Sequence, residues 1–219
     1  MTEHTAHLPD ALRARLSADY LPVKPLAAPM TRALWLLPIA VMTLLAAQFV
    51  FELRVDAPRL GWTGTWGVSS AQVLLGLIVA TAALREAVPG RSWSRAATGL
   101  WIGLPIAIVI TITWASWEAS PVILRGGWYF VGGLCLAGSV VSALPAVALA
   151  SILAARAYPL RPAVAGALLG LGAGLMADAG WRLFCHFSEP AHVLSAHLGG
   201  VLLSMCLGAV MAKRLATNP

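Results

Sequence analysis

GGWYFVGGLCLAGSVVSALPAVALASILAA, residues 126–155, is the longest stretch of the chain without a charged side chain. A helix needs about 20 mostly apolar residues to cross the hydrocarbon core of a membrane. In lipid, only a helix or a closed barrel satisfies its own backbone hydrogen bonds. The run is long enough to span the core, and it therefore predicts a transmembrane helix.

The composition of the whole chain points the same way. Of its 219 residues, 59% are hydrophobic and 11% are charged, whereas soluble domains carry about 25% charged residues. These values argue against a soluble enzyme, a nucleic-acid-binding protein and a disordered chain. In a polar protein a net charge of +6 would suggest a nucleic-acid partner, but here the basic side chains lie between apolar runs. We expect no direct contact with nucleic acid.

Further charge-free runs occur on both sides of this stretch. The fifth run of the chain ends at Asp178, which we expect at the membrane surface, because a carboxylate at the bilayer centre costs about 2.5–3.5 kcal/mol. The chain is therefore predicted to be an all-α polytopic membrane protein with six transmembrane helices. The six runs are Ala33–Phe51, Leu60–Leu84, Ala96–Trp117, Gly126–Ala155, Pro162–Ala177 and Pro190–Ala212.

The basic residues orient these helices, because cytoplasmic loops carry an excess of Lys and Arg. If the N-terminus is cytoplasmic, most of the Lys and Arg residues lie on the cytoplasmic side of the membrane. Both termini are therefore predicted to be cytoplasmic. We divide the chain into a cytoplasmic N-terminal segment (1–31), a six-helix membrane domain (32–214) and a cytoplasmic tail (215–219). The inner set is Arg13, Arg15, Lys24, Arg32, Arg85, Arg91, Arg95, Arg156, Arg161, Lys213 and Arg214, and the outer set is Arg54, Arg59, Arg125 and Arg182.

The N-terminal segment contains a short amphipathic pattern over residues 8–21. Four apolar residues at a spacing of four, Leu8, Leu12, Leu16 and Tyr20, form a narrow stripe on one face of a helix. Two interpretations stay open: a helix lying on the membrane surface, and a docking helix that binds the groove of a cytoplasmic partner. The prolines of PVKPLAAP (22–29) then predict a stiff extended spacer.

Small residues recur in the last two runs at a spacing of four. They are Gly166, Gly170 and Gly174 in the fifth run and Gly200, Ser204 and Gly208 in the sixth. Such faces allow two helix backbones to approach closely in a membrane. We therefore expect the last two helices to form a tight antiparallel hairpin.

The sequence offers no support for catalysis. It contains no phosphate-binding glycine loop, no HExxH and no GxSxG motif. The predicted spans have no central Asp, Glu, Lys or Arg, and Gln48 and Gln72 are the main polar exceptions. Ionisable groups inside spans mark proton relays and ion pathways. We predict that the chain is not an enzyme, and the lack of such groups weighs against a transporter.

Cys135 and Cys185 are the candidate chemical groups. They are 50 residues apart, yet on the predicted topology both lie near outer helix ends at the same membrane depth. His186 and His192 follow in the same outer loop as auxiliary candidates, and thiolate with imidazole suits Zn²⁺, Cu⁺ and other soft metals. Alternatively, the two thiols could form a disulfide or react with an oxidant.

A third cysteine and a further histidine are predicted to have structural roles only. Cys206, inside the last run, is expected to be a small apolar filler. His192 and His197 are five residues apart, which is about 140° around an α-helix, so we expect them on different faces. His197 is therefore predicted to be a hydrogen-bonded packing residue.

An ordered series of motifs now suggests a family. The chain resembles the NrsF family, six-helix inner-membrane negative regulators of sigma-F-type extracytoplasmic-function sigma factors. The resemblance covers essentially the whole chain from about residue 8, and the paired cysteines are its most specific part. The motifs are PVKPL (22–26), MTRALW (30–35), REAVPGRS (85–92), a Cys that opens the fourth helix, RPAVAGALLGLGAG (161–174), CHFSEP (185–190) and AKRL (212–215).

The resemblance implies a membrane-bound anti-sigma factor in the bacterial inner membrane. Such a protein would hold a sigma factor at the cytoplasmic face and release it when Cys135 and Cys185 sense heavy metal or oxidant from the periplasm. We expect no cofactor, and a soft metal ion would act only as a transient signal. Cys206 has no counterpart in the family pattern. The alternative is a small membrane transporter or permease subunit for a metal or a lipophilic compound.

Overall fold

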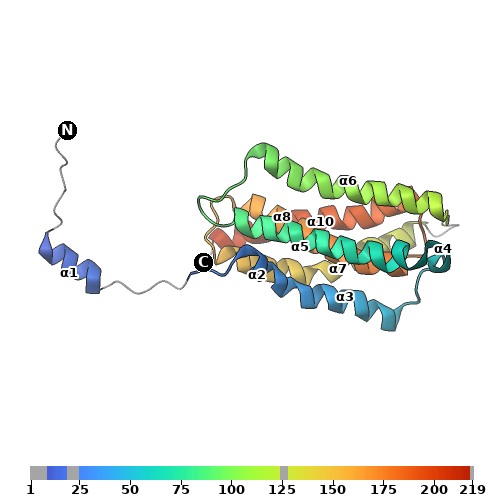
Figure 1. Cartoon of the computed structure of the whole chain (residues 1–219), viewed down its shortest axis with the longest axis horizontal. Coiled ribbons are helices and arrows are strands. Elements are labelled where there is room, and N and C mark those ends of the chain that lie inside the picture. The colour runs from blue at the N-terminus through green and yellow to red at the C-terminus, as the bar shows by residue number, and fades with distance from the viewer. Residues whose placement is uncertain (1–8, 19–24, 124–127, 218–219) are drawn as a thin grey trace.

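The computed structural model describes residues 9–18, 25–123 and 128–217 (Figure 1). Within these ranges every regular element is a helix, which confirms the predicted all-α class. The elements are α1 (Asp10–Ala18), α2 (Pro29–Ala33), η1 (Leu34–Leu36), α3 (Leu37–Val50), α4 (Ala57–Trp62), η2 (Thr63–Gly67), α5 (Val68–Glu86), α6 (Arg95–Ala119), α7 (Trp128–Ala155), α8 (Pro162–Phe184), α9 (Pro190–His192), η3 (Val193–Leu198) and α10 (Gly199–Thr217).

All helices after α1 form one elongated bundle (Figure 1). Among the described residues, five helical segments are long and apolar enough to cross a membrane, and they correspond to the second to sixth predicted spans. The first predicted span falls on a shorter apolar helix, Pro29–Leu45, so a sixth crossing stays a prediction. The five segments are Ala57–Glu86, Arg95–Ala119, Tyr129–Ala155, Pro162–Phe184 and Pro190–Thr217.

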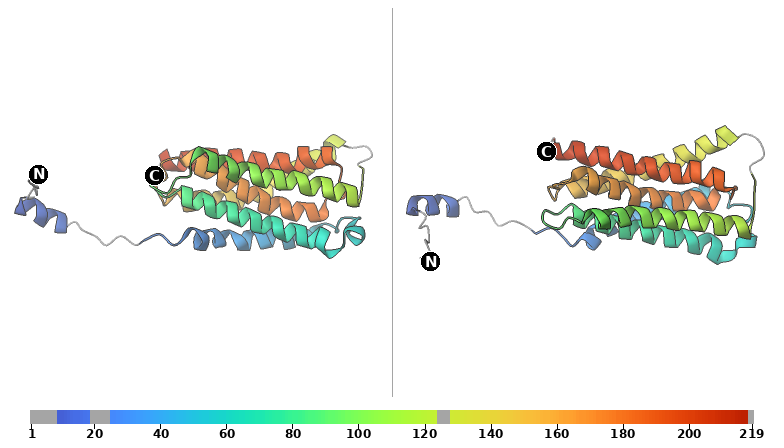
Figure 2. Two further views of the ribbon diagram at one scale, coloured as in Figure 1. Left: turned by 45° about the horizontal axis from the view of Figure 1, so that its top comes forward. Right: turned by 90° about the horizontal axis from the view of Figure 1, so that it is seen from above.

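The chain enters and leaves the bundle at the same end. Figures 1 and 2 show the N-terminal segment and the C-terminus on one side in each view. We call this side the terminal end and the opposite side the far end. The terminal end holds Glu86, Arg95, Ala155 and Pro162, and the far end holds Val50, Ala119, Trp128 and Phe184. Which end faces the cytoplasm stays a prediction.

The small residues of the last two spans bring α8 and α10 into backbone contact. Every residue of α8 from Leu168 to Gly180 is buried. A Cβ atom added to Gly170 would lie 2.1 Å from the carbonyl oxygen of Ser204, and one added to Gly166 would lie 2.2 Å from that of Gly208. Any side chain there would force the helices apart. The predicted tight antiparallel hairpin is confirmed.

α8 makes a second close contact, with α5, that was not predicted. A Cβ atom on Gly76 would lie 2.6 Å from the carbonyl oxygen of Gly172, and one on Gly172 would lie 2.7 Å from that of Gly76. Gly76 is a lone glycine within VLLGLIV, so no regular spacing marks it in the sequence. α8 therefore packs at backbone distance against two helices.

A buried carboxylate ties the terminal end together. Glu86 is the last residue of α5, and its side chain is fully buried. Its Oε1 accepts a hydrogen bond from Arg161 Nε (2.8 Å), and its Oε2 accepts one from the backbone N–H of Trp93 (2.6 Å). Arg161 also donates to the Trp93 carbonyl (2.7 Å), and the Arg85 guanidinium lies 3.7 Å from the Trp93 ring centroid. This network joins the start of α8 to the α5–α6 loop.

The predicted N-terminal stripe is described only in part. α1 confirms a helix inside residues 8–21, and Leu12 on it is exposed. Leu8 and Tyr20 lie outside the described residues, as does the side chain of Leu16. Figure 1 draws α1 away from the bundle. The choice between membrane surface and docking helix stays open.

Candidate metal and redox site

Four buried side chains meet at the far end of the bundle. Cys135 is on α7, Cys185 directly follows α8, His192 ends α9, and His197 lies in η3. One ligand atom from each of the four lies within 4.8 Å of all the others. We call these four residues the thiol–imidazole cluster.

The two sulfur atoms form the core of the cluster. The Cys135 thiol donates to Cys185 Sγ at 3.9 Å, and His192 Nε2 lies 3.2 Å from the same sulfur. Cys185 lies between two spans, and the hydrogen bonds from Cys135 and His192 hold the pKa of its thiol below the ordinary value. The shared membrane depth left open whether Cys135 and Cys185 touch, and the structure brings their sulfur atoms together. Both cysteines are free thiols.

The prediction that His192 and His197 lie on different faces is wrong. Residues Val193–Leu198 form a π-helix, in which each backbone N–H bonds to the carbonyl five residues earlier. Residues five apart therefore lie on one face, and the two imidazole centroids are 5.5 Å apart. A π-helical turn inside a longer helix is frequent at functional sites. His197 thereby joins the cluster.

Asp178, which was predicted at the membrane surface, is enclosed by protein, and its depth in the membrane stays a prediction. Asp178 has no exposed surface and lies inside the bundle on α8. The Nδ1–H of His197 donates to its Oδ1 (2.7 Å), and Gln72 Nε2 donates to its Oδ2 (2.8 Å). A buried carboxylate is tolerated only when it is hydrogen-bonded or paired. Here α5 and η3 supply the partners, so the carboxylate needs no water.

Two arginines of the predicted outer set, Arg54 and Arg182, are buried in protein at the far end. Arg182 donates from Nη2 to the hydroxyl of Thr113 on α6 (2.8 Å). Arg54 donates from Nη2 to Asp56 Oδ2 (2.7 Å), and its backbone N–H donates to the carbonyl of Leu183 (2.9 Å). These contacts join the α3–α4 connection and α6 to the end of α8. The residues around the cluster are therefore held by buried contacts between helices rather than by an unanchored loop.

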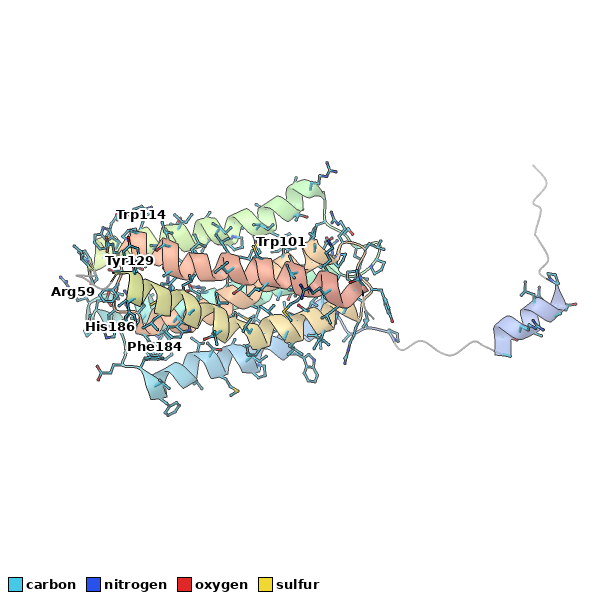
Figure 3. The ribbon with its side chains drawn as sticks, turned by 180° about the vertical axis from the view of Figure 1, so that it is seen from behind. Arg59, Trp101, Trp114, Tyr129, Phe184 and His186 are labelled. Carbon is cyan, nitrogen blue, oxygen red and sulfur yellow. The ribbon has the colours of Figure 1, made fainter. Side chains whose placement is uncertain are left out.

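The other candidate residues lie outside the cluster. His186 is half-buried, and its Nδ1 bonds with the carbonyl oxygen of Phe184 at 2.7 Å. Figure 3 shows both residues at the far end of the bundle. Cys206 is exposed on α10 and is not among the four clustered residues. Neither residue contributes a ligand atom to the cluster in this arrangement.

The sulfur atoms can be reached from one side. A cavity of about 160 Å³ is lined by both cysteines and by a wall that is mostly aromatic. A small ion or oxidant that entered it would meet Cys135 and Cys185 together. The remaining lining residues are Phe51, Val131, Trp181, Phe184, His186 and Phe187.

This geometry is compatible with two chemistries. Two thiols and two imidazoles within 4.8 Å offer the donor set that soft or borderline metal ions prefer. Two neighbouring thiols are equally a substrate for oxidation to a disulfide, for which the sulfurs would approach from 3.9 Å to about 2.05 Å. Disulfide formation would draw α7 toward the end of α8, whereas metal binding would need smaller movements of the side chains.

Comparison with known proteins gives one result. The family NrsF, described as negative regulator of sigma F, matches residues 16–217. No curated protein and no solved structure matches the chain. The family match covers every helix of the bundle and the whole thiol–imidazole cluster.

Proposed function

The chain belongs to the NrsF family of negative regulators of sigma F, and from this premise we propose that it is a membrane-bound anti-sigma factor. It would hold an extracytoplasmic-function sigma factor at the terminal end and release it when metal or oxidant reaches Cys135 and Cys185 at the far end. The observation that carries this proposal is the buried pair of free thiols in a chain of this family.

The distribution of charge supports a cytoplasmic terminal end. Basic residues of the helices and loops gather there, as the positive-inside rule requires of the cytoplasmic side. The far end would then face the periplasm of a bacterial inner membrane, where metal and oxidant arrive. The residues at the terminal end are Arg85, Arg91, Arg95, Arg156, Arg161, Lys213 and Arg214.

α8 offers a physical connection between the two ends. Arg161 caps its start and Cys185 caps its end, and its 23 residues span about 35 Å. Arg161 is bound to Glu86 in the terminal network, so a shift of α8 would alter the α5–α6 loop. The close glycine contacts make gradual sliding of α8 energetically costly. This favours two discrete packing arrangements of α8 over a continuous range of positions.

The energies are adequate for such a switch. Changing a bound population from about 99% to about 1% requires about 5.5 kcal/mol of differential binding. Structural zinc binding releases roughly 10–16 kcal/mol in total, and only the part that differs between the two packings shifts the equilibrium. A metal ion that favours one packing of α7, α8 and α10 could therefore release the partner.

Co-purification tests this proposal. The tagged protein would be extracted from its native bacterium in mild detergent, with and without added Cd²⁺ or hypochlorite, and its partners identified by mass spectrometry. We expect a sigma factor that is present without treatment and lost after it. Cys135→Ser and Cys185→Ser should retain the sigma factor under both conditions.

Cys206→Ser is the matched control, because it removes a thiol outside the cluster. This variant should respond as the wild type does. Recovery of no sigma factor under either condition would contradict the anti-sigma proposal and favour the transporter alternative. Normal release from both cluster variants would contradict the sensor assignment alone.

A further inference from the structure

We propose that Cys135, Cys185, His192 and His197 form one closed four-ligand site for a single divalent d¹⁰ metal ion, Zn²⁺ or Cd²⁺. Asp178 is the positioning residue that holds His197 in ligand orientation. The proposal deepens the proposed function, since it names the complete binding site for the signal. Its role in signalling rests on that function, but its geometry does not.

The distances match a tetrahedral site. With metal–sulfur bonds of about 2.3 Å and metal–nitrogen bonds of about 2.0–2.1 Å, ligand atoms lie about 3.3–3.8 Å apart. The two sulfurs are 3.9 Å apart, and Cys185 Sγ lies 3.2 Å from His192 Nε2. All four ligand atoms lie within 4.8 Å of one another. Small side-chain movements are enough to close a tetrahedron around one ion.

The two imidazoles carry buried nitrogens without a partner. His197 Nε2 and His192 Nδ1 have no hydrogen-bond partner, and both side chains are fully buried. An unpaired polar atom in the protein interior is destabilising and calls for a partner that is missing. A metal ion in the cluster supplies one for His197 Nε2.

Asp178 determines which nitrogen of His197 is free. The Nδ1 atom lies 2.7 Å from Asp178 Oδ1, so a neutral ring donates its proton there and keeps the Nε2 lone pair for a metal. Metal-binding histidines commonly donate their other N–H to a carboxylate in this way. Gln72 in turn binds the second oxygen of Asp178, so the carboxylate is oriented from two helices.

Charge also favours a divalent ion. Binding breaks the two S–H bonds of Cys135 and Cys185, releases two protons and forms two metal–sulfur bonds without a change of oxidation state. Two thiolates neutralise the +2 charge, and the imidazoles stay neutral. A site of zero net charge suits a buried position, where an unbalanced charge would be strongly destabilising.

A four-ligand site differs from a disulfide switch in what it requires. A disulfide needs only the two sulfurs as bonding atoms and forms no bond to His192 or His197. The proposed site uses two sulfurs and two nitrogens. The number of nitrogen ligands is therefore the observable that separates the two.

The test uses the full chain, reduced and metal-free, in lipid nanodiscs. Cd²⁺ is added, its stoichiometry is measured, and X-ray absorption or ¹¹³Cd NMR counts sulfur and nitrogen ligands. We expect one Cd²⁺ per chain with two sulfur and two nitrogen ligands. His197→Gln should lose one nitrogen ligand and bind Cd²⁺ at least tenfold more weakly.

The matched control is His186→Gln, because His186 lies at the same end but outside the cluster. It should keep the wild-type affinity and ligand count. Asp178→Asn should weaken binding about 10–100-fold while both nitrogens still bind, as expected for a positioning residue. The wild-type ligand count does not depend on any variant folding.

The proposal is overturned if the wild type binds no Cd²⁺ or shows sulfur ligands alone. An unchanged ligand count in His197→Gln would likewise remove His197 from the site. The proposed function fails separately: a chain that binds Cd²⁺ through two sulfurs and two nitrogens but recovers no sigma factor retains the metal site and loses the anti-sigma role.

Discussion

Replacing Gly170 by Ala tests the packing that holds α8 against α10. The added Cβ would lie 2.1 Å from the Ser204 carbonyl oxygen and 2.8 Å from Met205 Cα, which are both backbone atoms that no rotamer change can move. Ordinary contacts begin at 3.4 Å, so the two helices must separate by about 1.3 Å at this point. Overpacking of this kind costs about 1–3 kcal/mol.

Gly103→Ala on α6 is the matched control. A Cβ atom at Gly103 meets no atom within 4 Å, and both substitutions gain the same helix propensity of about 1 kcal/mol. The difference between the two variants therefore isolates the steric effect, and Gly170→Ala should be less stable by about 1–3 kcal/mol.

Unfolding by SDS in mixed micelles, followed by circular dichroism, measures this difference. Gly170→Ala should unfold at a lower SDS fraction than Gly103→Ala. It should also bind Cd²⁺ more weakly, because α10 continues from the η3 turn that carries His197. Equal SDS midpoints for the two variants would refute the reasoning from backbone contact.

Two further predictions concern opposite ends of the bundle. Glu86→Ala removes the carboxylate that accepts hydrogen bonds from Arg161 and from the Trp93 N–H. The α5–α6 loop should then loosen, and trypsin should cleave the variant faster than the wild type at Arg91. An unchanged cleavage rate would contradict the network. N-ethylmaleimide should modify the two cluster cysteines much faster after unfolding in SDS than in the folded chain, because these are about 93% buried. Mass spectrometry locates the labels, and equal labelling rates before and after unfolding would contradict their burial.

The spans could be predicted from the sequence because lipid imposes one rule on every residue. A charged side chain or an unpaired backbone group is costly in hydrocarbon, so the charge-free runs correspond to helices. The contact between α8 and α10 could also be predicted from the sequence. Small residues spaced four apart lie on one face of a helix and allow a second helix to approach closely. The predicted topology put Cys135 and Cys185 at one membrane depth, which made them candidate residues but did not predict their contact.

The rest of the site depends on contacts between helices that are distant in the sequence. The partners of Asp178 are Gln72 and His197, which are 106 and 19 residues away. Without these two hydrogen-bond partners, burying the Asp178 carboxylate would be strongly unfavourable. His197 is buried and hydrogen-bonded as predicted, but its position beside His192 was missed because α-helical spacing was assumed. No residue pattern in VLSAHL indicates a π-helical turn. The pairing of Glu86 with Arg161 joins residues 75 apart.

The central claim is that a signal at the far end releases a sigma factor from the terminal end, across the membrane. Spheroplasts of the native bacterium expose the periplasmic face alone, and Cd²⁺ can be added outside before the membrane and soluble fractions are separated. For the wild type and Cys206→Ser, we expect the sigma factor to move from the membrane to the soluble fraction. For Cys185→Ser, it should stay with the membrane. Equal release from Cys185→Ser and the wild type would contradict the account.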